Sequence, residues 1–185
     1  MSARAFAFAA PTQLQFGAGR LSEGAPLAAT LGRRAVVVQG GGDRAAPLVE
    51  ALRAQGLDVQ VQRCTGEPTV ALVERLAAHA RREHRDLVIA LGGGSVIDTG
   101  NAIAALITNP APVRDYLEVV GRGRPLEVAS VPFVAIPTTA GTGAEVTRNA
   151  VLLAEAEWVK VSLRSAHMLP TAAILDPALT GSLPA

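Results

Sequence analysis

The sequence predicts an α/β fold in which a parallel sheet carries helices on both faces, and the alternation of two kinds of segment along the chain supports this prediction. Short apolar runs, typical of buried strands, alternate along the chain with longer segments of helical periodicity. Such alternation is typical of a parallel sheet whose strands are joined by helices. With 185 residues, the chain has the length of one ordinary domain, and we treat residues 1–185 as a single domain.

Five short runs predict the strands of this sheet. They are rich in Val, Ile and Leu, and glycine or proline closes several of them. The run DLVIAL at 86–91 is apolar almost throughout, as expected for a strand that is buried on both faces. The other expected strands cover residues 34–39, 57–62, 133–137 and 171–177.

The segments between these strands predict three helices. In them, apolar residues recur three and four positions apart, so that they fall on one helical face. The expected helices cover residues 44–56, 69–84 and 95–108, and a Pro- and Gly-rich loop with one short helix is expected over 109–132.

The stretch ALGGGSVIDTG at 90–100 is a candidate anion site. Gly92, Gly93 and Gly94 follow the apolar strand, and Ser95 is expected to open the next helix, with Asp98 completing a capping box. A helix N-terminus presents free N–H groups, and glycine lets a phosphate approach the backbone. A tight strand-to-helix turn that binds nothing is the alternative, because the spacing is neither GxGxxG nor a P-loop.

Two further strand ends favour binding over a bare turn. The segment QGGGD at 39–43 follows the strand at 34–39, and IPTTAGTGAEVT at 136–147 carries four threonines and two glycines. In parallel sheets, ligands bind at the carboxyl ends of the strands. We therefore expect the three polar strand ends to line one edge of the sheet.

Composition narrows the classes of partner. Seventeen basic and sixteen acidic residues give a net charge of +1, which argues against a nucleic-acid-binding surface. The N-terminal apolar stretch is too short to span a membrane, and the single Cys64 fits a reducing compartment, so we expect a cytoplasmic protein.

Several motifs occur together along the chain. They are, in order, FGAG (16–19), EPT (67–69), GGGSVIDTG (92–100), IPTTAGTGAEVTRNAV (136–151), VKVSLRS (159–165) and AILDPALTGSLP (173–184). With these motifs the chain resembles the iron-containing, or group III, alcohol dehydrogenases. The resemblance implies a Rossmann-like, dehydroquinate synthase-like N-terminal domain that binds NAD or NADP. It also implies hydride transfer between the cofactor and a small alcohol or aldehyde.

The resemblance also assigns roles to individual residues. Gly93, Gly94 and Ser95 are expected to contact the cofactor diphosphate, and Asp98 to shape the start of that helix. The other residues implied are Thr138, Thr139 and Thr142 around the diphosphate and nicotinamide, Lys160 on a ribose, and Pro68 near the adenosine half.

Two positions depart from the family pattern. NAD-preferring members carry an aspartate at the end of the second strand, where this chain has Gly40. Without that carboxylate a 2′-phosphate is not repelled, so we expect NADP to be favoured over NAD. Asn101 replaces a family lysine in the helix after the glycines, which predicts weaker attraction for the diphosphate.

The family's divalent metal, iron or zinc, is held by one aspartate and three histidines of a helical domain that would follow residue 185. The three histidines here, His79, His84 and His167, lack metal-ligand spacing, and we interpret them as structural or solvated. We therefore expect neither metal ligands nor catalytic residues on this chain, and no activity from it alone. A non-catalytic dinucleotide-binding module and a related reductase, such as maleylacetate reductase, are the alternatives.

Dimerisation through N-terminal strands in the family makes LQFGAG (14–19) a candidate edge for a homo-oligomer.

Overall fold

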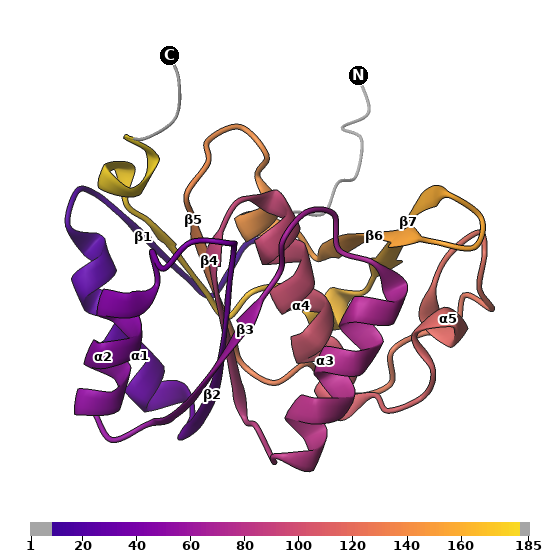
Figure 1. Cartoon of the computed structure of the whole chain (residues 1–185), viewed down its shortest axis with the longest axis horizontal. Coiled ribbons are helices and arrows are strands. Elements are labelled where there is room, and N and C mark those ends of the chain that lie inside the picture. The colour runs from indigo at the N-terminus through magenta and orange to yellow at the C-terminus, as the bar shows by residue number, and fades with distance from the viewer. Residues whose placement is uncertain (1–8, 182–185) are drawn as a thin grey trace, which may run out of the picture.

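In the computed structural model, which describes residues 9–181, a parallel sheet of six strands separates two layers of helices (Figure 1). The strand order is β1-β8-β5-β4-β2-β3, and every neighbouring pair is parallel. The predicted fold class is therefore confirmed. The strands are β1 (Gln13–Phe16), β2 (Arg34–Gln39), β3 (Asp58–Arg63), β4 (Leu87–Gly92), β5 (Phe133–Pro137) and β8 (Ala172–Leu175).

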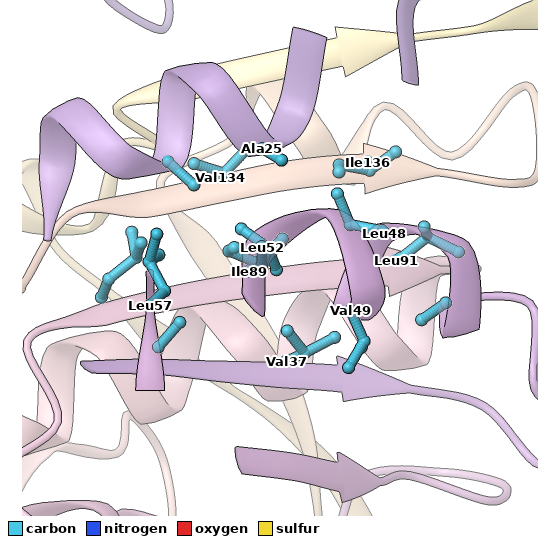
Figure 2. Packing of buried hydrophobic residues seen from close by; sticks show 14 of the residues in the cluster. Ala25, Val37, Leu48, Val49, Leu52, Leu57, Ile89, Leu91, Val134 and Ile136 are labelled. Carbon is cyan, nitrogen blue, oxygen red and sulfur yellow. The ribbon is translucent and has the colours of Figure 1, made fainter. Parts of the chain in front are cut away.

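The helices cover both faces of this sheet. Helices α1 (Gly24–Leu31) and α2 (Ala46–Ala54) lie on one face, and α3 (Val70–Arg82) and α4 (Gly94–Thr108) lie on the other. Figure 2 shows the first interface, where Ala25 of α1 and Leu48 and Leu52 of α2 pack on side chains of β4 and β5. Every residue of β4 is buried, as its apolar sequence predicts for a central strand.

A two-stranded antiparallel hairpin, β6 (Asn149–Ala154) with β7 (Val159–Arg164), packs against α4 outside the main sheet. The hairpin and α1 were not predicted from the sequence, whereas β1 overlaps LQFGAG (14–19), the candidate edge that the family resemblance implies. The short helix expected in the loop at 109–132 is present as α5 (Val113–Tyr116). Four 3-10 turns complete the described residues: η1 (Arg20–Glu23), η2 (Ala144–Val146), η3 (Ala166–Met168) and η4 (Pro177–Thr180).

The three polar strand ends meet at one edge of the sheet, as expected. Strand β4 lies between β2 and β5, with Gln39 paired to Leu91 and Gly92 paired to Pro137. From β2 the chain leaves through α2 on one face, and from β4 it leaves through α4 on the opposite face. Adjacent strands whose connections diverge in this way form the crevice in which open α/β sheets bind ligands.

Helix α4 approaches the sheet closely at Gly100. A Cβ added there would lie 2.7 Å from the Cβ of Ala90 and 2.9 Å from Cε2 of Phe133. Gly100→Ala is expected to lower the free energy of unfolding by about 1–3 kcal/mol, because overpacking of the core outweighs the better helix propensity of alanine. Urea denaturation measures the effect. In the control variant Gly42→Ala, the new Cβ meets no described atom within 4 Å, so we expect little change. A Gly100→Ala midpoint equal to or above the wild type would contradict the prediction.

Candidate functional site

The N-terminus of α4 is left without a side-chain cap in the described residues. Its N-cap is Gly93, in an extended backbone conformation, and the helix begins at Gly94. The predicted capping box between Ser95 and Asp98 is therefore wrong, because the N-cap lies two residues before Ser95, which is inside the first turn of the helix. The N–H groups of Gly94 and Ser95 belong to the orphan donors of a helix start. They are available to an external acceptor such as a phosphate oxygen.

A cavity of about 290 Å³ opens beside this helix start, between the ends of β2 and β4. Because glycines form most of its wall, backbone rather than side chains faces the space. A Cβ added at Gly40 would meet only Cγ2 of Val96, at 4.0 Å, so the gap beyond β2 has room for a ligand. The lining residues are Gly40, Gly41, Gly42, Arg44, Leu91, Gly92, Gly93, Val96 and Thr138.

The threonines after β5 surround the same glycine turn. The N–H of Thr138 donates to the carbonyl of Gly92 at 2.9 Å. The side chains of Thr139 and Thr142 lie against Gly93 and Gly94 respectively, where a Cβ added to each glycine would contact them. The hydroxyl oxygen of Thr139 is buried and has no hydrogen-bond partner in the described part of the chain. A buried hydroxyl without a partner is a candidate ligand contact.

A second cavity, of about 240 Å³, lies beyond Thr139 at the carboxyl ends of β5 and β8. Its wall is more apolar than that of the first cavity, and Glu145 places a buried carboxylate oxygen there that has no partner among the described residues. The two cavities together extend the site to both sides of the helix N-terminus.

Lys160, Pro68 and Asp98 meet where the β6–β7 hairpin approaches α4. The ammonium group of Lys160 lies 3.0 Å from a carboxylate oxygen of Glu67, and the carbonyl of Pro68 accepts from the N–H of Leu153 at 2.8 Å. Burial raises the pKa of Asp98 to about 6, the backbone N–H of Val151 opposes this rise, and Glu67 adds to it. The structure thus brings these predicted residues together on the hairpin side of the site.

The raised pKa of Asp98 predicts a pH dependence of stability. A carboxyl group whose pKa is higher in the folded state than in the unfolded state binds more protons when folded. Stability should therefore fall as the pH rises from about 4 to 6, by about 1–2 kcal/mol after allowance for partial exposure. Asp98→Asn is expected to remove this slope, as measured by urea denaturation across that range. A slope that is the same in Asp98→Asn and wild type would contradict the assignment.

Asn101 lies away from the glycine turn. It is fully buried, and its side-chain amide donates to the carbonyl of Asn149 in the hairpin at 3.4 Å. Seven residues separate it from Gly94, which is about 10 Å along a helix axis. The side chain of Asn101 would therefore not contact a diphosphate bound at the glycine turn, so the predicted weaker attraction cannot come from a direct contact.

Arg63 was not singled out from the sequence, but its side chain holds the glycine segment after β2. The guanidinium donates to the carbonyls of Gly41 and Gly42 at 2.8 and 3.1 Å and pairs with Asp43 at 2.5 Å. Parallel pairing of β2 with β3 brings Arg63 beside Gln39, so only the strand order reveals this contact.

The histidines belong to other surroundings. His79 contacts Gln60 and Arg82, and the backbone N–H of His167 donates to the hydroxyl of Ser165 at the start of η3. Within residues 9–181, no group of three or more His, Cys, Asp or Glu side chains could hold a metal ion. In the same residues no helix has the length and hydropathy to cross a membrane.

Comparison with known proteins decides the family. The family model described as iron-containing alcohol dehydrogenase matches residues 11–177. The chain belongs to the iron-containing alcohol dehydrogenase family. This confirms the resemblance drawn from the motifs.

Individual relatives place the chain within this family. It is 39% identical to 4-hydroxybutyrate dehydrogenase of Cupriavidus necator over 132 residues, and this match covers 71% of this chain and 34% of the relative. The structure of an iron-containing alcohol dehydrogenase from Thermotoga maritima is 30% identical with a TM-score of 0.85, covering 97% of this chain and 50% of the other. Sulfoacetaldehyde reductase from Bifidobacterium kashiwanohense, solved in complex with NAD+, is 30% identical with a TM-score of 0.84, covering 98% and 49%. The chain thus spans about half of the solved family members and matches about a third of the curated relative.

Proposed function

We propose that this chain forms the NAD(P)-binding half of a metal-dependent alcohol dehydrogenase, in which hydride passes between the nicotinamide and an alcohol or aldehyde. The observation that carries this proposal is the uncapped N-terminus of α4, which opens on a glycine-lined cavity at the divergence of β2 and β4. An anion fits there because the first N–H groups of the helix have no side-chain acceptor. The family relative solved with NAD+ supports a dinucleotide as the ligand.

The residues around the two cavities suggest how a dinucleotide would be held. Gly93, Gly94 and Ser95 would donate N–H groups to the diphosphate. Gly40 and Pro68 lie on the side of the adenosine, and the threonines lie on the side of the nicotinamide. Lys160 would turn from Glu67 to a ribose hydroxyl, which its exposed position allows. The residues that we propose for the nicotinamide side are Thr138, Thr139 and Thr142.

The cofactor that we propose is NADP, with NAD bound less tightly. Gly40 places no carboxylate at the end of β2, so nothing at that position repels a 2′-phosphate. The described residues contain no group of His, Cys, Asp or Glu side chains that could hold the metal. We therefore assign it no ligand on residues 9–181 and propose that these residues bind the cofactor without it.

Isothermal titration of the chain with NADPH and NADH in the presence of EDTA tests the proposal. We expect one cofactor bound per chain, with NADPH bound more tightly and no turnover of alcohols. Turnover by this metal-free chain would contradict its assignment as a cofactor-binding half that is not competent alone. Failure to bind either cofactor would contradict the proposed function itself.

We also propose that the chain forms a homo-oligomer through the edge strand β1. This strand pairs only with β8 in the described residues, and the side chains of Leu14 and Phe16 are largely exposed beside its free backbone edge. Leu14→Lys is expected to lower the mass measured by light scattering to that of a single chain. The control variant is Val128→Lys, at a similarly exposed residue of the loop before β5. An unchanged mass for Leu14→Lys would contradict the proposed edge.

A further inference from the structure

The side chain of Arg63 binds the glycine segment that forms one wall of the first cavity. It is the last residue of β3, and its side chain crosses to the turn after β2. One guanidinium nitrogen donates to the carbonyls of Gly41 and Gly42, and the other binds a carboxylate oxygen of Asp43. The guanidinium is therefore oriented by backbone carbonyls on one side, with that of Gly40 at 3.5 Å as a third acceptor, and by a single carboxylate on the other.

The ion pair between Arg63 and Asp43 is exchanged more easily than the contacts of Arg63 with the backbone carbonyls. The side chains of Arg63 and Asp43 are 47% and 76% exposed, so the pair is open to solvent, beside the glycines of the cavity wall that Arg63 contacts. Exposed ion pairs are weak, and an external anion of higher charge can displace the carboxylate. The carbonyls of Gly41 and Gly42 would meanwhile keep the guanidinium in place. Such a pre-oriented guanidinium loses little conformational freedom when it binds an anion.

We propose that Arg63 recognises the 2′-phosphate of NADP and that Asp43 competes with this phosphate for the same guanidinium. This inference rests on the proposed dinucleotide site, in which the adenosine ribose lies beside Gly40. A guanidinium can offer two parallel N–H groups to a phosphate, a geometry that lysine lacks. When NAD is bound, which has no 2′-phosphate, Asp43 keeps its ion pair with Arg63.

The pair of ligands that differ only in this phosphate provides the test. Adenosine 2′,5′-bisphosphate and adenosine 5′-monophosphate are titrated into the wild-type chain and two variants by calorimetry. Arg63→Met is expected to weaken binding of the bisphosphate by about 10–100-fold, the range of a hydrogen bond to a charged group, and of the monophosphate by less than about threefold. Asp43→Asn is expected to tighten the bisphosphate by up to about fivefold and to leave the monophosphate unchanged.

Matched controls separate this role from general charge effects. Arg124 and Glu127 form an exposed ion pair at 2.7 Å, and the Arg124 side chain is 47% exposed, as that of Arg63 is. Arg124→Met and Glu127→Gln should leave both affinities unchanged. Arg44 also lines the cavity, so Arg44→Gln is measured in parallel. Thermal unfolding of each variant establishes that it is folded.

The outcomes separate the inference from the function on which it rests. If Arg63→Met weakens both ligands equally, Arg63 only positions the loop, and the assignment is overturned while the dinucleotide site stands. Loss of discrimination in Arg44→Gln alone would likewise overturn it. If the wild-type chain binds neither ligand, both the proposed function and this assignment are overturned.

Discussion

Replacing Gly40 with aspartate is expected to reverse the proposed cofactor preference, from NADPH to NADH, with a shift in the ratio of the two affinities of about 10–100-fold. The site accepts the new side chain, because a Cβ there meets only Val96, at 4.0 Å. The added carboxylate would accept hydrogen bonds from the ribose hydroxyls of NADH and repel the 2′-phosphate of NADPH. It would also compete for Arg63, which acts in the same direction.

Calorimetric titration with both cofactors measures this shift. Val128→Asp is the matched control, because it adds the same charge at an exposed residue that lines neither cavity. We expect it to change the ratio by less than about threefold through screened repulsion alone. A Gly40→Asp variant that still binds NADPH as tightly as the wild type does would contradict our placement of the adenosine ribose.

The buried strands of the sheet could be predicted because their sequences carry the signal of burial. The strand β4 is apolar over its length and lies at the centre of the sheet, and β2 and β5 are predicted for the same reason. Strand β1 has only four residues at an exposed edge, and α1 contains glycine and proline in its first turn. These two elements are stabilised by contacts with β8 and α2 rather than by their own sequence pattern.

The candidate site was predictable where it requires only that the sheet be parallel, whatever the order of its strands. The glycines and threonines come together because parallel strands end at one edge of the sheet. The contact of Arg63 with the glycine segment depends on β3 pairing with β2, a long-range fact that no local pattern reveals. The predicted capping box was wrong because the local pattern fitted an N-cap at Ser95, whereas the structure has its N-cap two residues earlier, at Gly93.

Replacing Gly93 with aspartate is expected to preserve or slightly raise stability while it abolishes cofactor binding. Gly93 is the N-cap of α4 and has an extended backbone, and aspartate is favoured at such a position. A Cβ there makes ordinary contacts with Thr139, at 3.5 and 3.7 Å. The gain in the free energy of unfolding should be between zero and about 1 kcal/mol. The new carboxylate would accept the same N–H groups that a diphosphate needs, so affinity for NADPH and NADH should fall at least about 100-fold.

This combination of opposite effects distinguishes a ligand cradle from a bare turn. If the glycines serve only the turn from β4 to α4, an aspartate cap alters nothing but stability. Gly93→Asn supplies the control, because it caps the helix without adding a charge and should weaken binding less than the aspartate does. Thermal unfolding and calorimetric titration of the three proteins give the two effects separately. An aspartate variant that binds both cofactors within about threefold of the wild type would mean that the diphosphate lies away from the N-terminus of α4.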